Sequence, residues 1–381
     1  MQIMTKLIEC DKDFHLARSI RLRVNNKEVV APKRALSASQ NRMFNEVVLT
    51  NDLIRGIIEV YRHIDRGKIH AMLTNNDEAA RFSNEISLSL KEAKNNEIIM
   101  GVLECDIEGV LPTLEQTNML LHILNNPYFD VVTPPLLSKV TCEAYMNFLD
   151  MFIEVYKSSS FRPALVPFIP HYSISSLPDL VRYYTEKDVF ENNLICVDFN
   201  GSSPISQYMF VSAIVKEAVT LEREIKQPVF LHADNLKYGK ATKKLAVAPA
   251  KDLVIFTMGF NSFGSSHKRI AISSGIGNYE LKTKLLNRDD YGYYSLEKVR
   301  NVIKESQNYY VCVEDVLTNQ KMARVFNAER QGLEAYELYE KIRAHELKRY
   351  VFSKSQIAKE PLILKKVNKV QETALQKTLE L

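Results

Sequence analysis

Short apolar runs rich in β-branched residues recur through the first two thirds of the chain, with stretches of helical periodicity between them. The runs occupy residues 46–50, 69–73, 98–103, 130–133, 164–169, 194–197, 229–232 and 253–256. Their spacing of roughly 25 to 35 residues is the length of a strand, a helix and two loops. Several runs are apolar almost throughout, which is typical of parallel strands covered on both faces. Eight such units predict an α/β fold, a (β/α)8 TIM-type barrel, and an open doubly wound sheet is the alternative.

Helical patterns fill the gaps between the runs and dominate the last part of the chain. Residues 207–225 place apolar side chains at helical spacing on one face, as expected of a helix that packs on a sheet. Residues 261–278 are rich in glycine and serine, and from residue 295 onward the pattern is mostly helical. We therefore predict a barrel with an N-terminal extension at residues 1–285 and a helical C-terminal region with a basic tail at residues 286–381.

Composition narrows the class of protein further. Of the 381 residues, 46% are hydrophobic and 25% are charged, which excludes a disordered chain, a collagen and a small disulfide scaffold. No apolar stretch is long enough to span a membrane, and residues 1–11 lack a signal-peptide pattern, so we expect no membrane association. The five cysteines form no CxxC pair, which favours a reducing, cytoplasmic location.

The net charge of +4 is unevenly distributed, because residues 321–381 hold 13 Lys and Arg against 8 Asp and Glu. A basic tail on a nearly neutral body fits an acidic partner such as nucleic acid. A solvated helical face has the same appearance in a sequence.

Polar side chains follow several predicted strands at the point where each strand ends, and in a parallel barrel these ends form the active site. Asp106 and Asp198 come directly after apolar runs, and we predict that both are catalytic; each also has the alternative role of capping the helix that follows. Predicted substrate-binding residues at other strand ends are Asn200, Gly201, Ser202, His232, Asp234, Thr257 and Gly259. These groups suit a polar ligand with several hydrogen-bonding edges better than they suit a metal.

The loop after the seventh run carries four lysines beside Tyr238. Exposed cations contact phosphates, and an aromatic ring stacks on a base. We therefore predict nucleic-acid binding by Lys237, Lys240, Lys243 and Lys244, with an ordinary solvated loop as the alternative.

Three parts of the chain resemble the tRNA-guanine transglycosylase superfamily, which includes the queuine and archaeosine tRNA-ribosyltransferases. They are residues 27–37, residues 229–239 with 250–256, and a set of C-terminal positions that includes Arg288, Cys312 and Asn327. Members of that superfamily are (β/α)8 barrels that exchange a guanine in nucleic acid for a 7-deazaguanine base. The resemblance implies tRNA or DNA as the partner and a 7-deazaguanine base as the second substrate. We also expect the chain to assemble as a homodimer or a heterodimer.

The chain departs from the family that it resembles at positions that carry the family's catalysis and zinc binding. Thr257 stands where the family has its nucleophilic aspartate, and only Asp106 remains of the family's Asp-Ser-Gly-Gly segment. The family's four zinc ligands match Cys312, Glu314, Leu317 and Phe326, so one ligand of four is present. A lone thiolate does not hold zinc, and we predict no structural zinc, no other metal and no cofactor, with the C-terminal region held by apolar packing.

Two functional hypotheses follow. The first is a divergent transglycosylase, a pentosyltransferase in which Asp198 is the nucleophile and Asp106 the acid or base, because the Thr257 hydroxyl is too weakly acidic to attack alone. The second is a catalytically silent paralogue that binds nucleic acid or partners an active subunit, and an unrelated barrel lyase or hydrolase is a weaker third option. Two carboxylates within about 5 Å of each other across the pocket would favour an enzyme.

Overall fold

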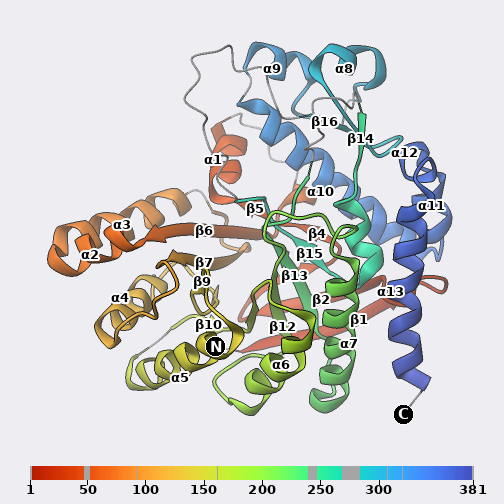
Figure 1. Ribbon diagram of the computed structural model, residues 1–381. Coiled ribbons are helices and arrows are strands. Elements are labelled where there is room, and N and C mark those ends of the chain that lie inside the picture. Colours follow the sequence, from red (N-terminus) through yellow and green to blue (C-terminus); the bar gives the residue numbers. More distant parts are fainter. Residues whose placement is uncertain are drawn as a thin grey trace.

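The computed structural model describes residues 2–46, 52–91, 93–160, 162–238, 247–267, 284–306, 308–319 and 321–379. The chain has a mixed α/β fold in which parallel strands lie at the centre and helices lie outside them (Figure 1). None of the described helices is long and apolar enough to cross a membrane.

The parallel strands form two sheets. The first has the order β10-β8-β7-β6-β5, with β9 also paired to β7, and the second has the order β11-β12-β13-β15-β4. The strands of the first sheet are β5 (Leu36–Ser37), β6 (Ile57–Asp65), β7 (Ile98–Asp106), β8 (Val131–Val132), β9 (Leu136–Leu137) and β10 (Ala164–Leu165). Those of the second are β4 (Lys33–Arg34), β11 (Phe168–Ile169), β12 (Leu194–Asp198), β13 (Phe230–Asp234) and β15 (Ser262–Phe263). Every pairing within both sheets is parallel.

An antiparallel sheet of β1 (Ile3–Cys10), β2 (Arg18–Val24) and β3 (Lys27–Val30) lies against the amino ends of the parallel strands. Burial alternates along β2, because a sheet with one covered face buries every second side chain. The buried side chains of β2 share one apolar cluster with Ile57 and Phe230, the first residues of β6 and β13. The amino ends are therefore covered, and the carboxyl ends remain for chemistry.

Helices connect the parallel strands and cover their outer faces. They are α1 (Ala38–Glu46), α2 (Arg66–Thr74), α3 (Asn76–Leu90), α4 (Leu114–Leu124), α5 (Cys142–Ser158), α6 (Leu177–Glu186) and α7 (Tyr208–Ile225). Three 3-10 turns lie at η1 (Asp52–Ile54), η2 (Ile174–Ser176) and η3 (Leu253–Met258). The helix predicted at residues 207–225 is confirmed as α7, which ends at Lys226 in the left-handed conformation.

Five of the eight predicted strands are confirmed, namely those at 98–103, 130–133, 164–169, 194–197 and 229–232. Two are wrong: residues 69–73 lie in α2, and residues 253–256 lie in η3. The side chain of Asp65 accepts a hydrogen bond from the Lys68 amide and so starts α2, while Gly259, at a φ of 97°, ends η3. Of the run at 46–50, Glu46 ends α1 and the rest lies outside the described residues.

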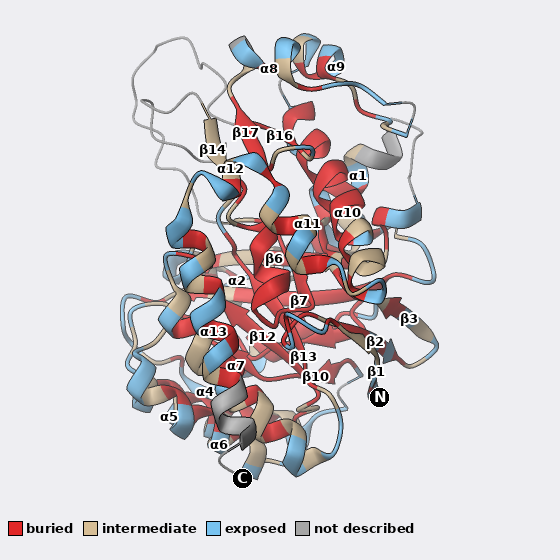
Figure 2. Cartoon of the chain, turned by 90° about the vertical axis from the view of Figure 1, so that its right-hand side faces the viewer, coloured by how far each residue is buried: buried red, intermediate tan, exposed pale blue. Residues whose placement is uncertain are grey.

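The C-terminal part combines a small sheet with helices. Strands β14 (Val247–Pro249), β16 (Leu285–Asn287) and β17 (Gly292–Tyr294) pair antiparallel in the order β14-β17-β16. The helices are α8 (Leu296–Val302), α9 (Val313–Thr318), α10 (Met322–Arg343), α11 (Leu347–Ser353), α12 (Ser355–Ala358) and α13 (Pro361–Leu379). Helix α10 is buried along most of its length (Figure 2). The apolar packing predicted for this region is present, in a cluster that includes Val299, Val316 and Phe326.

Candidate functional site

Three buried side chains from two separated strands meet inside the parallel strands. They are Glu59 of β6 and His232 and Asp234 of β13, and none of them is exposed to solvent. Side chains of a strand alternate between its two faces, so Glu59 lies on the same face as Ile57, and His232 and Asp234 on the same face as Phe230. One ligand atom from each of the three lies within 4.8 Å of the others. We call Glu59, His232 and Asp234 the buried triad.

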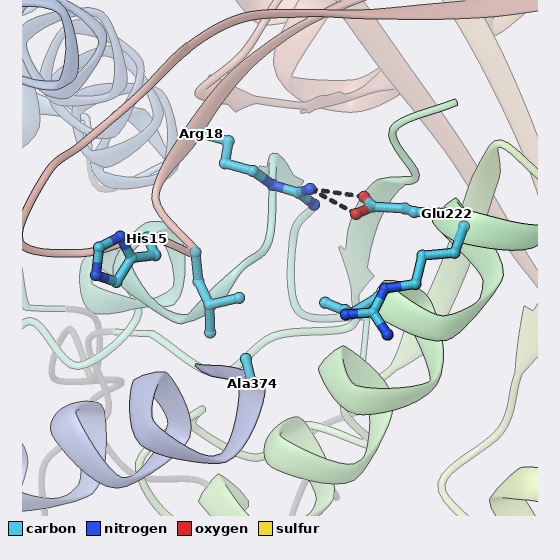
Figure 3. Close-up of a pocket in the computed structure, with 7 residues that line it drawn as sticks. His15, Arg18, Glu222 and Ala374 are labelled. Atoms are coloured by element: carbon cyan, nitrogen blue, oxygen red, sulfur yellow. Dashed lines mark hydrogen bonds and ion pairs between the residues drawn. The ribbon is translucent and has the colours of Figure 1, made fainter. Parts of the chain in front are cut away.

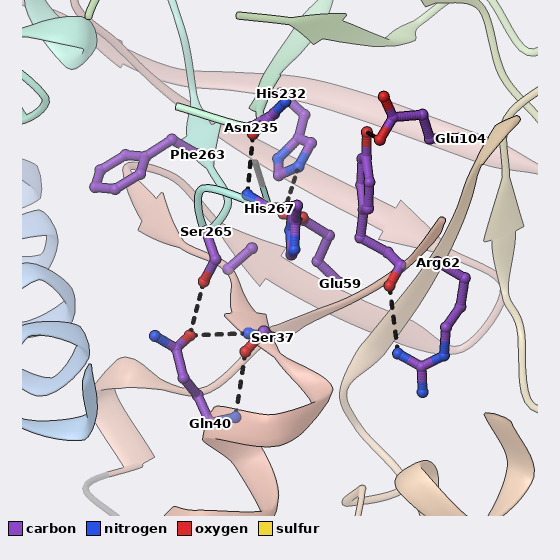
Figure 4. Close-up of polar contacts among 12 residues, drawn as sticks. Ser37, Gln40, Glu59, Arg62, Glu104, His232, Asn235, Phe263, Ser265 and His267 are labelled. Atoms are coloured by element: carbon purple, nitrogen blue, oxygen red, sulfur yellow. Dashed lines mark hydrogen bonds and ion pairs between the residues drawn. The ribbon is translucent and has the colours of Figure 1, made fainter. Parts of the chain in front are cut away.

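Neighbouring side chains hold Glu59 and His232 in place (Figure 4). Glu59 Oε2 lies 3.4 Å from His232 Nε2, and Glu59 Oε1 contacts His267 Nε2. The other ring nitrogen of His232, Nδ1, lies 2.8 Å from Ser262 Oγ. The ring of Tyr61 stacks on His267 with 4.3 Å between the ring centroids. Each member of the triad thus comes from a strand, and two of them have a second group that fixes their orientation.

The pKa values of the two carboxyl groups of the triad shift in opposite directions. Burial raises the pKa of Asp234 well above its usual range, and the nearby charge of Glu59 raises it further. Burial also acts to raise the pKa of Glu59, but His267 and His232 outweigh this effect and hold that pKa below its usual range. Neither oxygen of Asp234 has a hydrogen-bond partner within the part of the chain that the structure describes.

Gly264 gives Glu59 the room it occupies. A Cβ atom at Gly264 would lie 1.4 Å from Glu59 Oε2, which is far inside van der Waals contact. The Gly264 amide donates to the Ala233 carbonyl at 2.8 Å, so the backbone there is tied to β13. Position 264 therefore requires glycine as long as Glu59 stays where it is.

Asp198 lies at the carboxyl end of β12, directly paired with Asp234 in the register of the two strands. Its Oδ1 accepts hydrogen bonds from the Asn200 amide at 2.8 Å and from Asn235 Nδ2 at 3.3 Å. Burial raises the pKa of Asp198 to about 6; the hydrogen bonds from Asn200 and Asn235 oppose this, and the charge of Glu104 adds to it. Asp198 is thus a nearly enclosed carboxyl at the edge of the same site.

Glu104 of β7 forms the opposite rim together with Tyr61 and His63. Tyr61 donates its hydroxyl to Glu104 Oε2 at 2.9 Å, and His63 Nδ1 lies 3.3 Å from the same oxygen. The pKa of Tyr61 is raised well above its usual range by burial and by the charges of Asp234, Glu104 and Asp198. The Tyr61 phenol therefore contacts Glu104 directly and is influenced by the charges of Asp234 and Asp198.

The structure brings together three of the predicted site residues, Asp198, His232 and Asp234. The loop of Asn200, Gly201 and Ser202 adjoins them, because Asn200 binds Asp198 and the Gly201 amide donates to the Asn235 carbonyl at 2.9 Å. Glu59 and Asp234 are two carboxyl groups that lie within 5 Å of each other.

Asp106 lies away from the buried triad. It is six residues beyond Met100, the position on β7 that pairs with Glu59, which is about 20 Å along a strand. The Asp106 side chain is 34% exposed, accepts a hydrogen bond from Ser138 Oγ at 2.9 Å and contacts Lys139 Nζ at 3.4 Å. The Ser138 hydrogen bond is the largest cause of its lowered pKa. Its catalytic role stays a prediction from sequence.

Thr257 and Gly259 do not end a strand, since η3 stands where the eighth strand was predicted. Thr257 is buried, its hydroxyl donates to the Val254 carbonyl, and its own carbonyl accepts from Gln371 of α13. A Cβ at Gly259 would lie 3.0 Å from Val215 of α7. Both residues thus pack toward the outer helices, and the prediction that they follow a strand into the site is corrected.

Of the four predicted lysines, Lys237 is exposed and its backbone amide donates to the Ser202 carbonyl at 3.0 Å. This bond joins the start of the lysine loop to the loop after β12. Lys240, Lys243 and Lys244 lie outside the described residues.

A separate cavity of about 310 Å³ lies between the β1–β2 segment, α7 and α13 (Figure 3). An ion pair of 2.6 Å between Arg18 and Glu222 crosses it. It is lined by His15, Leu16, Arg18, Val219, Glu222, Arg223 and Ala374. None of these residues belongs to the buried triad or its neighbours, so this cavity is distinct from the candidate site.

No protein-family model matches the chain, and no curated protein matches it. Among solved structures, it is similar to the enoyl reductase domain of MlnA from the macrolactin biosynthesis cluster of Bacillus amyloliquefaciens. The identity is 11%, the match covers 89% of this chain and 98% of that chain, and the TM-score is 0.32. A likeness at this TM-score carries no argument about the chain.

Proposed function

We propose that the chain is a (β/α)8-barrel pentosyltransferase of the transglycosylase type, acting on a purine nucleotide in tRNA or DNA. The observation that carries the proposal is the enclosed carboxyl of Asp198, held by Asn235 and Asn200 at the carboxyl end of β12. A carboxylate at this position of a barrel is suited to attack an electron-poor carbon.

The strand pairings support a closed barrel. Only Ala35 separates β4 from β5, and two residues separate β10 from β11, so each pair continues one strand from one sheet into the other. Pairing then runs from β5 through β6, β7 and β8 to β10, and from β11 through β12, β13 and β15 back to β4. A ring of this kind has no free edge, and its chemistry belongs at the carboxyl ends.

In the proposed reaction, the Asp198 carboxylate attacks C1′ of the ribose as the bond from C1′ to guanine N9 breaks. The electron pair of that bond leaves with the guanine, which takes up a proton. The incoming 7-deazaguanine gives up a proton and attacks C1′, which releases Asp198. Atoms and charge balance, because one base and one proton leave as one base and one proton arrive.

We assign the proton transfer to Glu104 in place of Asp106. Glu104 precedes Asp106 by two residues on the same face of β7, and its charge acts on Asp198. Its Oε2 is already positioned by Tyr61 and His63. Asp106, in contrast, is held by Ser138 and Lys139 at a distance from the buried triad.

The test compares Asp198→Asn with the matched variant Asp106→Asn, by incorporation of labelled guanine into tRNA and into DNA. We expect Asp198→Asn to lower the rate at least about 10²-fold, because the amide neither attacks carbon nor accepts a proton. Asp106→Asn should retain most of the rate. A large loss in both variants would support Asp106 as the acid or base, and a large loss in Asp106→Asn alone would refute the role given to Asp198.

A nucleic-acid-binding subunit without catalysis is the second candidate, and the placement of Thr257 favours it. The family that the sequence resembles has its nucleophile there, whereas the Thr257 hydroxyl is buried and bonded within η3. Wild-type protein that binds tRNA or DNA but incorporates no labelled guanine, alone or with a partner subunit, would support this second function.

A further inference from the structure

The buried triad has an excess of unpaired polar atoms. Among the described residues, Glu59 Oε2, His232 Nε2 and both oxygens of Asp234 have no hydrogen-bond partner, and all three side chains are fully buried. Burying carboxyl and imidazole groups without partners is costly, and proteins avoid it unless another group pairs with them. One ligand atom of each side chain lies within 4.8 Å of the others, so one small cation among them would pair with all three side chains.

The distances within the triad fit a metal ion. Two ligand atoms that each lie about 2.1 Å from a tetrahedral ion are about 3.4 Å apart. Glu59 Oε2 and His232 Nε2 are 3.4 Å apart, and one ligand atom of each of the three residues lies within 4.8 Å of the others. The separation is also within the range allowed for an ion pair, but the geometry does not meet that of a hydrogen bond.

A second set of residues positions the ligands, as is usual around metals. Ser262 Oγ contacts His232 Nδ1 at 2.8 Å, so an Nδ1–H that donates to it leaves the Nε2 lone pair facing Glu59. His267 holds the other oxygen of Glu59, and Tyr61 stacks on His267. Gly264 leaves the space beside Glu59 Oε2 free of a side chain.

We propose that Glu59, His232 and Asp234 bind a divalent first-row transition-metal ion. Two carboxylates and one imidazole suit Mn²⁺, Fe²⁺, Co²⁺ and Zn²⁺, whereas an imidazole ligand disfavours Mg²⁺ and Ca²⁺. The ion would neutralise the two carboxylates and use the lone pairs that lack partners. This inference does not depend on the transglycosylase proposal, because metal binding is measured without any substrate.

The alternative is that Glu59 and Asp234 share a proton and that no metal enters. Both arrangements relieve the repulsion between the two carboxyl groups. They differ in that only a metal site takes up an ion at one equivalent per chain and shows a ligand-field spectrum.

The experiment uses the full chain, stripped with a chelator and titrated with Co²⁺ and, separately, with Zn²⁺ and Mn²⁺. We expect one equivalent of Co²⁺ per chain, a visible d–d absorption band, and a rise in Tm on metal addition. Asp234→Asn and His232→Gln should lower the affinity by more than about 100-fold, beyond the 10- to 100-fold loss usual for outer-shell changes. The outer-shell change Ser262→Ala should weaken binding but keep the absorption band.

Asp252→Asn is the matched control, since Asp252 is another fully buried carboxyl, bonded to Tyr293 and Gln331 and outside the triad. It should bind metal as the wild type does. The proposal is overturned if folded wild-type protein takes up none of the three ions, or if Asp234→Asn and His232→Gln both bind with wild-type affinity. Should either variant fail to fold, Glu59→Gln replaces it. The wild-type titration still tests by itself whether the protein binds a metal ion.

Discussion

At the scale of single residues, the site depends on one small side chain as much as on its charged ones. Glu59 reaches His232 and His267 only because position 264 carries no Cβ. Glu59 and Gly264 lie some 200 residues apart in sequence, and each limits what the other position tolerates.

Gly264→Ala should therefore destabilise the protein. The added methyl group would overlap Glu59 Oε2, and relieving that overlap in a packed interior costs typically about 1–3 kcal/mol. Urea unfolding followed by circular dichroism measures the change. Gly67→Ala is the control, because its Cβ would meet nothing closer than Asp65 Oδ1 at 3.5 Å in helix α2. That variant should be neutral or slightly more stable, and equal losses in both would contradict the role given to Gly264.

At the scale of elements, strand β6 shows what the sequence pattern detects and what it misses. The strands β7, β8, β12 and β13 are apolar almost throughout, and the search for apolar runs finds them. β6 carries Glu59, Arg62 and His63 because it lines a polar site, and its run is broken by the chemistry it positions. The search instead selects the apolar face of α2, at 69–73.

The failure to predict β6 also explains which residues of the candidate site were predicted and which were not. Asp198, His232 and Asp234 follow or end strands that the pattern identifies, so reasoning from strand ends reaches them. Glu59, Tyr61 and His267 lie on β6 or beyond β15, neither of which the pattern finds, and Glu104 lies within β7. The alternation of polar and apolar residues along 57–65 is the signal that was available. The expectation of no metal rested on Cys and His spacing and stays a prediction; such spacing does not detect carboxylates and histidines that come together from separate strands, as Glu59, His232 and Asp234 do.

The boundary between β6 and α2 gives a prediction at this scale. Asp65 ends β6 and its Oδ1 accepts from the Lys68 amide at 2.8 Å, so Asp65→Ala should cost about 0.5–2 kcal/mol of unfolding free energy. Asp65→Asn, which also caps helices well, should cost much less. Guanidinium unfolding of the two variants side by side decides the point, and identical losses would mean that the cap contributes nothing measurable.

At the scale of the whole molecule, Asp252 joins three parts of the fold. It lies directly before η3 and accepts from Tyr293 of β17 at 2.7 Å and from Gln331 of α10 at 2.9 Å. Arg34 of β4, whose Nε donates to Gln331 Oε1 at 2.9 Å, belongs to the same network. The parallel strands, the small sheet and the long C-terminal helix therefore meet at one buried carboxyl.

The stability of the whole chain should depend on pH through this group. Burial raises the pKa of Asp252 to about 6, while Tyr293 and Gln331 act to lower it. Because the folded pKa lies above the unfolded value, the folded state holds the proton more tightly. The stabilisation that Asp252 contributes is then fully present below about pH 4. It is lost as the pH rises through about 6, which lowers the free energy of unfolding by about 3 kcal/mol in total.

Asp252→Asn removes this dependence, since the amide does not titrate in that range. The measured quantity is the free energy of unfolding of the wild type minus that of the variant, determined in urea from pH 4 to pH 8. This difference should fall as the pH rises through about 6 and level off at higher pH. Parallel curves for the two proteins would show that Asp252 does not titrate as described.

The N-terminal sheet has a consequence for how the chain is made. Thr5 Oγ1 donates to the Pro228 carbonyl at 2.6 Å, and Asn193 Nδ2 donates to the Ile3 carbonyl at 2.7 Å, so strand β1 is completed by segments some 190 to 220 residues later. At a synthesis rate of about 5–20 residues per second, β1 waits roughly 10 to 40 s for its partners. During that interval the apolar face of β2 is only partly covered, because its cluster includes Ile57, which is made early, and Phe230, which is made last. We therefore expect strand β1 to be completed only after most of the parallel strands have been made.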